Sequence, residues 1–122
     1  MSPELTVCVL YGCVIVEVWG EVDLSSVPAL ERHLSAVIAS AVIAMQASAI
    51  VLDLSRLLFI DCAGLRVLLD AERRAAARGK SFALAAPRRI VARLLETTGL
   101  DQHFIAFPTV AEAVVAAVSP PC

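Results

Sequence analysis

A predicted strand and a predicted helix meet in residues 59–69, Phe59-Ile60-Asp61-Cys62-Ala63-Gly64-Leu65-Arg66-Val67-Leu68-Leu69. Upstream, residues 50–54 form a short β-branched, apolar run, which is typical of a strand buried on both faces. Downstream, apolar residues recur at helical spacing until Arg78-Gly79 ends the pattern. Asp61 stands at the N-cap position, where its carboxylate accepts from backbone N–H groups of the first turn. Cys62 is therefore expected at a helix N-terminus, where the amides and the macrodipole favour a negative group.

Length and charge limit the classes of protein that fit. The chain has 122 residues, which supports one domain with a single core. We predict one domain over residues 1–122, with a core over about 5–118 and a flexible tail at 119–122. The formal net charge is −2 at pH 7, and the arginines are interleaved with acids or alanines. We predict no nucleic-acid partner, because such surfaces need clustered basic residues.

The high apolar content raises the question of a membrane span. Hydrophobic residues make up 59% of the chain and charged residues 18%, and residues 34–52 carry no charge. That run is rich in alanine and contains three serines and one glutamine, so its tendency to insert is weak. Residues 1–6 lack the basic start and apolar run of a secretion signal. We therefore predict a cytoplasmic protein without membrane insertion.

The N-terminal segment reads as a β-hairpin. Residues 5–10 and 13–19 are β-rich runs separated by Tyr11-Gly12, a reasonable two-residue turn. Such a turn sets Cys8 opposite Ile15. The two cysteines of the hairpin then do not face each other, and we predict no disulfide between them.

The next segment has the pattern of a helix. Ser25 or Ser26 followed by Pro28 indicates a helix start, with proline near its first position. One apolar stripe, broadened by Ile38 and Val42, follows at helical spacing and consists of Leu30, Leu34, Val37, Ala41 and Met45.

The second half of the chain continues the alternation of predicted strands and helices. Residues 81–85 read as a short strand, and Pro87 opens a helix that Gly99 ends. The expected buried side of that helix consists of Ile90, Val91, Leu94 and Leu95. Residues 104–107 are a last predicted strand, and a last helix follows up to Val118.

The predicted order is β-β-α-β-α-β-α-β-α, an α/β fold. Strands that alternate with helices after a hairpin imply a mixed, mostly parallel sheet with one antiparallel edge and about four helices. In such sheets, ligands and partners meet the loops at the carboxyl ends of the strands. The loop at Asp23 and the Asp61-Cys62 turn are both candidates for that edge.

Single residues of the chain fit several kinds of chemistry, but in each case the partner residues that the chemistry needs are missing. Cys62 at a helix start resembles an activated nucleophile, yet no histidine motif accompanies it, and Asp61 beside it acts against a lowered thiol pKa. Asp23, Asp53 and Asp61 form a weak candidate for a metal or acid–base cluster, but Asp53 lies inside a strand-to-turn segment and is expected to hydrogen-bond locally. The cysteines and histidines lack metal-ligand spacing. We predict no catalytic residue, no metal and no cofactor, and we keep a redox switch at Cys62 as an alternative.

An ordered set of short motifs resembles the STAS domain of anti-sigma factor antagonists. The motifs are Gly20-Glu21-Val22-Asp23-Leu24, Val51-Leu52-Asp53-Leu54-Ser55, Phe59-Ile60-Asp61-Cys62-Ala63-Gly64-Leu65 and Gly99-Leu100-Asp101. They occur in the order found in that family, and the likeness covers about Leu5 to Val118.

The resemblance implies a regulatory binding module rather than an enzyme. Members of the family bind a serine-kinase anti-sigma factor and so release a sigma factor, and the kinase reverses this by phosphorylating a serine in an Asp-Ser-Ser/Thr/Ala-Gly-Leu turn. By likeness, the regulatory turn here consists of Asp61, Cys62, Ala63, Gly64 and Leu65. The partner-binding residues that the resemblance implies are Asp23, Leu24, Asp61, Cys62 and Arg66. Asp61, Gly64 and Leu65 match the family's turn, and Asp23 matches its acidic loop residue.

The phosphorylated serine is the one clear departure from the family's pattern. Cys62 occupies its place and Ala63 follows, so this turn has no hydroxyl group. A phosphate adds about two negative charges, and serine phosphorylation cannot supply them here. We therefore expect binding without this control, or a Cys62 whose oxidation to sulfinate or sulfonate supplies negative charge instead.

Two alternatives to an anti-sigma factor antagonist stay open. One is a STAS subunit of a larger assembly, such as a lipid-transport complex or a stress-signalling particle, and the other is a thiol redox sensor that uses Cys62. The oligomeric state is also open, with a homodimer among the alternatives. Nucleotide binding has been proposed for some domains of the family, but this sequence contains no phosphate-binding loop.

Overall fold

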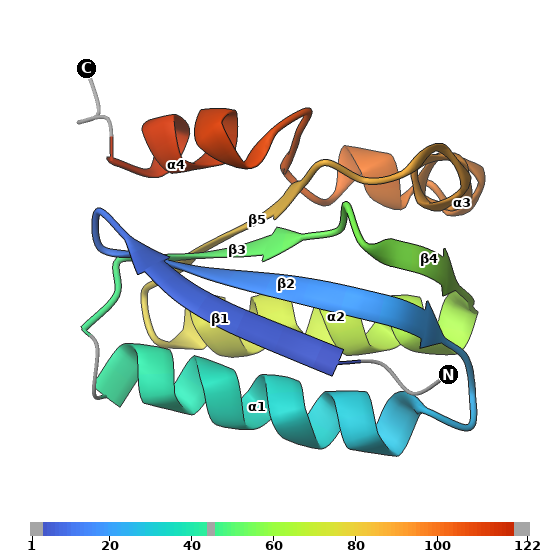
Figure 1. Cartoon of the computed structure of the whole chain (residues 1–122), viewed down its shortest axis with the longest axis horizontal. Helices are drawn as coiled ribbons and strands as arrows, with labels where there is room; N and C mark the ends of the chain where they lie inside the picture. Colours follow the sequence, from blue (N-terminus) through green and yellow to red (C-terminus); the bar gives the residue numbers. More distant parts are fainter. Residues whose placement is uncertain (1–3, 44–45, 119–122) are drawn as a thin grey trace.

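A mixed β-sheet with helices on both faces forms the framework of the protein (Figure 1). The computed structural model describes residues 4–43 and 46–118. The strands are β1 (Glu4–Leu10), β2 (Cys13–Val22), β3 (Ala49–Asp53), β4 (Leu57–Ile60), β5 (Ser81–Ala85) and β6 (Ala106–Phe107). The helices are α1 (Val27–Ile43), α2 (Cys62–Ala77), α3 (Arg89–Thr98) and α4 (Val110–Val118), with a 3-10 turn, η1 (Leu100–Gln102), after α3.

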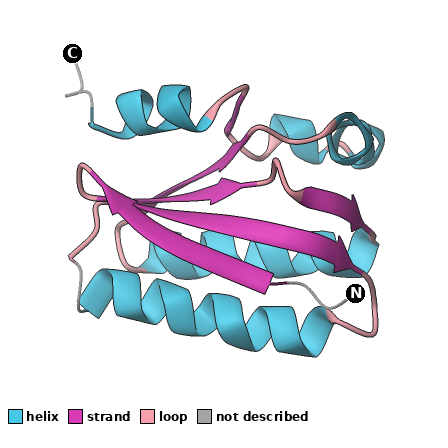
Figure 2. Ribbon diagram, viewed as in Figure 1, coloured by secondary structure: helices cyan, strands magenta, loops and turns pink. Residues whose placement is uncertain are grey.

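The sheet confirms the predicted mixed topology. The strand order is β1-β2-β3-β5-β6, and β4 pairs with β2 beside this path. Only the β1–β2 pairing is antiparallel among the described strands. Helices α1 and α2 lie side by side on one face, and α3 and α4 lie on the other (Figure 2).

Strand β2 contributes to the packing on both faces of the sheet. Its Val14, Val16 and Val18 belong to the larger apolar core, which also includes residues of α1, α2 and α3. Cys13 and Ile15, which point the other way, belong to a smaller core beneath α4. Alternate residues of a strand face opposite sides of the sheet, so this one strand joins the two cores.

The hairpin and the first helix follow the sequence-based expectation. Leu10 pairs with Cys13, and Cys8 pairs with Ile15, as a two-residue turn requires. In α1 the predicted stripe is buried at Leu30, Leu34 and Ala41, together with Ile38. The predicted stripe residue Met45 and the predicted tail at 119–122 lie outside the described residues.

The strand order differs from the prediction at β4. The segment that was expected to lead directly into the helix forms a strand of its own, so the sheet has six strands rather than five. The N–H of Leu57 donates to the carbonyl of Leu54 (3.1 Å) and closes a tight turn after β3. Strand β4 then pairs with the end of β2, and the register shifts between Gly20 and Glu21 within this pairing.

Two further expectations about the second half were wrong in detail. The last strand is confined to Ala106–Phe107, because Phe104 packs into the core, where its ring centroid lies 6.4 Å from that of Phe82. Ile90, expected on the buried side of α3, is 56% exposed because Val91 and Leu95 form the buried face. None of the helices in the described part of the chain is long and apolar enough to span a membrane.

Candidate functional site

Two loops that are far apart in the sequence meet at the carboxyl edge of the sheet. Val22, the last residue of β2, pairs with Ile60, the last residue of β4. The backbone N–H of Asp61 also donates to the carbonyl of Val22 (3.2 Å). The loop at Asp23 and the turn at Asp61 therefore start side by side.

The first turn of α2 is fixed by its N-cap. Asp61 has extended backbone angles, and its Oδ1 accepts from the N–H of Gly64 at 3.0 Å. The carbonyl of Asp61 accepts from the N–H of Leu65 (3.0 Å), the first bond of the helix. Cys62 is the first helical residue and its side chain is exposed.

Gly64 is required by close packing rather than by backbone freedom. A Cβ at this position would lie 2.5 Å from Cγ1 of Ile60 and 2.7 Å from Cγ1 of Val22. Both distances are too short for real contacts, so the start of α2 approaches the ends of β2 and β4 as closely as it does only with glycine. Leu65 is buried in the core. Gly64 and Leu65 thus hold the turn in place and leave Cys62 and Ala63 to form its outer surface.

A shallow groove of about 490 Å³ lies between the N-terminal halves of α1 and α2. Its walls come from the loop before α1 and from both helices, and consist of Leu24, Val27, Glu31, Cys62, Ala63, Arg66, Val67 and Asp70. Leu24 is 74% exposed, so it adds an apolar side chain to the surface of the groove. The groove brings together three of the predicted partner-binding residues, Leu24, Cys62 and Arg66.

Asp23 organises the loop from which Leu24 projects. Its Oδ1 accepts from the hydroxyl of Ser25 (2.7 Å) and from the N–H and the hydroxyl of Ser26 (3.2 Å each). In return, the N–H of Asp23 donates to Oγ of Ser26 (3.0 Å). The hydrogen bond from the Ser25 hydroxyl is the largest cause that lowers the pKa of the Asp23 carboxyl; desolvation opposes it, and the bonds from Ser26 add to the lowering. Asp23 is therefore an ionised residue at the rim of the site, and it does not line the groove itself.

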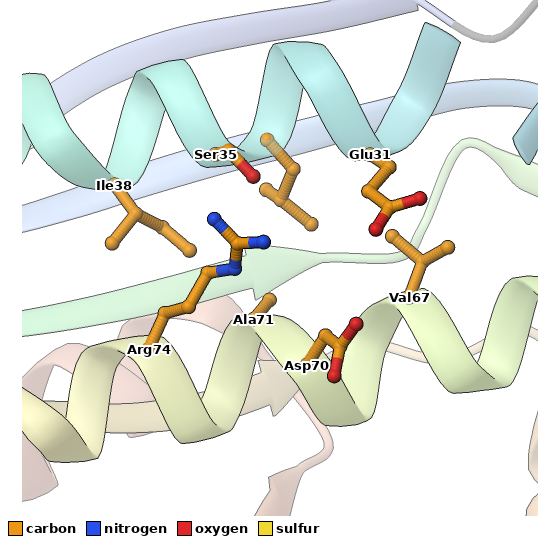
Figure 3. A pocket seen from close by; sticks show the side chains of 8 residues that line it. Glu31, Ser35, Ile38, Val67, Asp70, Ala71 and Arg74 are labelled. Carbon is orange, nitrogen blue, oxygen red and sulfur yellow. The ribbon is translucent and has the colours of Figure 1, made fainter. Parts of the chain in front are cut away.

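The charges of the groove are mostly acidic. Glu31 from α1 and Asp70 from α2 line it, and Arg66 is its one basic lining residue. Figure 3 shows the adjoining seam between the helices, where Glu31, Asp70 and Arg74 project into the space between α1 and α2. Together with an exposed leucine, this arrangement suits a protein surface that carries basic and apolar side chains.

The remaining sequence candidates do not join this site. Asp53 is 8% exposed, and its Oδ1 accepts from the N–H of Ser55 (3.0 Å), the local bond that was predicted. Among the described residues, no group of three or more His, Cys, Asp or Glu side chains is arranged to hold a metal ion. His103 contacts the carboxylate of Glu72, and neither residue lines the groove. Burial raises the pKa of the Cys13 thiol.

Sequence reasoning missed half of the groove. Val27, Glu31, Val67 and Asp70 line it, yet none was predicted as a site residue. A signal was present, since Val27 and Glu31, like Arg66 and Asp70, are spaced four residues apart and so share one helix face. What the sequence could not show is that these two faces meet each other.

A capped helix start and a groove therefore lie together at this edge of the sheet. A sequence profile of the STAS domain matches residues 4–113. The chain belongs to the STAS domain family.

The similar proteins include antagonists of anti-sigma factors. The anti-sigma-F factor antagonist RsfB of Mycobacterium tuberculosis is 29% identical over 113 residues, which cover 93% of this chain and 88% of that protein. The crystal structure of an anti-sigma factor antagonist from Mycobacterium paratuberculosis superposes with a TM-score of 0.83 at 30% identity, covering 97% of this chain and 96% of the other. The unphosphorylated form of SpoIIAA, a Bacillus anti-sigma factor antagonist, superposes with a TM-score of 0.70 at 23% identity. The match covers 94% of this chain and 95% of SpoIIAA, and at this identity it supports the fold alone.

Proposed function

We propose that this protein is a non-catalytic antagonist of an anti-sigma factor of the serine-kinase type, which it binds through the groove between α1 and α2. Binding would sequester the anti-sigma factor and release a sigma factor for transcription. The chain would act as one STAS module in the bacterial cytoplasm, where transcription takes place. The observation that carries the proposal is that exposed Leu24, Cys62 and Arg66 line one groove.

The relatives support this assignment. The curated relative from Mycobacterium tuberculosis is described as an anti-sigma-F factor antagonist, and the crystallised protein from Mycobacterium paratuberculosis as an anti-sigma factor antagonist. Both matches extend over nearly the whole chain, so they include the groove as well as the sheet. The acidic groove adds a physical reason, because Glu31 and Asp70 favour a partner surface with basic side chains.

Loss of the acceptor serine changes the expected control of binding. The turn carries Cys62 and Ala63, so a kinase finds no hydroxyl at the start of α2. A phosphate here would add negative charge next to Glu31 and Asp70 in a surface that must pack against another protein. Without it, the antagonist stays competent to bind whenever it is present.

Titration calorimetry against each kinase-type anti-sigma factor of the source organism tests the proposal. We expect the native chain to bind at least one of them, and Arg66→Glu and Leu24→Asp to weaken that complex about tenfold or more. The matched controls are Arg93→Glu and Ile90→Asp, which make the same changes at exposed α3 positions outside the groove. If no anti-sigma factor binds, or if the α3 variants weaken binding as much as the groove variants do, the proposal fails.

Restoring the hydroxyl gives a second test. With the anti-sigma factor that binds, Cys62→Ser is expected to become a substrate for phosphorylation by ATP, whereas the native chain is not. Mass spectrometry of the peptide that contains position 62 measures this directly. Phosphate on the native chain at the start of α2 would contradict the proposed lack of control.

A further inference from the structure

Strand β1 forms an open, apolar edge of the sheet. It stands at the end of the strand order and pairs only with β2 among the described strands. Val7, Val9 and Leu10 are 38%, 50% and 45% exposed, and Cys8 between them is exposed as well. Edge strands are commonly protected by lysine, proline, a bulge or a covering segment. The seven residues of β1 contain neither lysine nor proline, and their pairing with β2 is regular throughout.

The turn at Tyr11-Gly12 determines which backbone groups of this edge are free. Its φ angles of 51° and 77° fit a type I′ turn, in which the two flanking residues exchange both of their hydrogen bonds. Bonded and non-bonded pairs alternate from that point along an antiparallel ladder. The N–H and C=O groups of Leu5, Val7 and Val9 therefore point away from β2 and are available to another strand.

We propose that β1 pairs with β1 of a second copy of this chain, antiparallel and centred on Val7. In that register Val7 faces the second copy's Val7, and Leu5 faces the second copy's Val9. Each of these pairs exchanges two hydrogen bonds, so every outward group of the three residues is satisfied. The two sheets then form one continuous sheet about a two-fold axis, and the interface uses the same residues from both copies.

The charge on β1 supports a second copy and its orientation. Glu4 is the only charged residue of the strand and lies at its first position. A parallel pair would place the two Glu4 carboxylates next to each other, which is unfavourable. In the antiparallel pair they lie at opposite ends, each beside an uncharged Leu10. The strand can therefore pair with a second copy of itself without a contact between like charges in the antiparallel direction only.

The size of this contact predicts a weak dimer. A stable interface typically involves about 20–30 residues a side, and β1 has seven residues. We therefore expect a dissociation constant between about 1 μM and 1 mM. No residue that lines the groove belongs to β1, so a dimer would present two grooves at once. The inference stands independently of the proposed function.

The register can be tested with a matched pair of double variants. In the proposed dimer Thr6 faces the second copy's Cys8 in a non-hydrogen-bonded pair, where side chains lie closest. Thr6→Lys with Cys8→Lys places two like-charged pairs across the interface. Thr6→Glu with Cys8→Lys places two opposite-charged pairs at the same exposed positions. Circular dichroism and thermal melting establish that both variants fold.

Sedimentation velocity over a concentration series, with reductant present to prevent disulfides, measures the dimer. We expect the native chain to shift from monomer to dimer as concentration rises, the double-lysine variant to associate at least about tenfold more weakly, and the Glu/Lys variant to dimerise. A native chain that stays monomeric up to about 1 mM overturns the proposal, because the expected dissociation constant lies below that concentration. A dimer that both variants leave unchanged, or that both abolish, overturns it as well.

Hydrogen exchange of the native chain provides a measurement without substitutions. The amides of Leu5, Val7 and Val9 are expected to exchange more slowly at high protein concentration, while the amides of Thr6 and Cys8, already bonded to β2, change less. An exchange rate at Val7 that does not depend on concentration, in a sample that sedimentation shows to be dimeric, would place the interface elsewhere.

Discussion

Helices α2 and α3 both begin near the carboxyl edge of the sheet, but their first turns are built differently. At the start of α2, Asp61 accepts a hydrogen bond from Gly64 and the backbone is packed tightly against β2 and β4. At the start of α3, the N-cap residue is Arg88, which makes no side-chain cap and instead donates from Nη1 to the carbonyl of Ser55 (3.2 Å). Only the α2 start lies on the groove. Both helices start after a strand, so this placement alone does not distinguish the site. The start of α2 differs in being capped by a side chain and closely packed.

The largest effect is expected at the packed glycine of α2. Gly64→Ala should lower the free energy of unfolding by about 2–3 kcal/mol, because the new methyl group overlaps Ile60 and Val22. Urea denaturation measures the change. The control is Gly99→Ala at the end of α3, where φ is 79° but nothing lies within 4 Å, so only backbone strain of about 1 kcal/mol applies. Equal costs at the two glycines would show that the α2 start is not tightly packed.

Substitution of the two N-cap residues by alanine should show the difference between the two helix starts directly, as a difference in the loss of stability. Asp61→Ala is expected to cost about 1 kcal/mol of unfolding free energy, because the N–H of Gly64 loses its acceptor. Arg88→Ala should cost only a few tenths of a kcal/mol, since an exposed bond to Ser55 is lost and no cap is removed. The same denaturation experiment compares them. A cost for Arg88→Ala as large as that for Asp61→Ala would contradict the difference described above.

The converse change should make the α3 start resemble that of α2. Arg88 has an extended backbone (φ −65°, ψ 158°), which is suitable for an N-cap residue. Arg88→Asp is therefore expected to raise the unfolding free energy by about 0.5–1 kcal/mol, through a new cap and a favourable interaction with the helix dipole. Thermal melting measures the gain. A loss of stability would mean that the bond from Arg88 to Ser55 matters more than capping.

The smallest effect concerns pH and the loop at Asp23. Because hydrogen bonds lower the pKa of this carboxyl in the folded chain, its contribution to stability is complete above the unfolded pKa and is lost as pH falls through the folded value. We expect the NMR signals of the Ser26 amide to report this titration. Ser25→Ala should move the Asp23 pKa upward toward its ordinary value, since the Ser25 hydroxyl makes the largest contribution. An Asp23 pKa that stays the same in Ser25→Ala would show that the hydrogen bond from Ser25 does not cause the lowered pKa.

Much of the framework follows from local sequence signals. The hairpin register was predictable because a two-residue turn leaves one way to align the strands, and Asp61 was predictable as a cap from its place before a helical pattern. Strand β4 was not predictable as a separate strand, because its four apolar residues are followed by the helix without a glycine or proline between them. Its pairing with β2 is a contact between distant segments, which periodicity does not reveal.

The candidate site was predictable only in part, for a similar reason. The turn residues came from the likeness to a family, and Cys62 was correctly placed at the start of a helix. Glu31 and Asp70 were missed because each looks like an ordinary polar residue on its own helix. They become part of one groove only through the packing of α1 against α2, which depends on the whole core.

The position of β2 between the two cores also bears on how the chain folds. This strand has a local neighbour, β1, joined by a two-residue turn, and two distant neighbours, β3 and β4, joined through crossovers. The hairpin can form in microseconds, whereas the parallel pairings require the closure of long loops and are slow. The β1–β2 hairpin is therefore exposed and apolar before α1 and β3 arrive. The edge strand that we propose joins two folded copies is therefore also an aggregation-prone segment during folding.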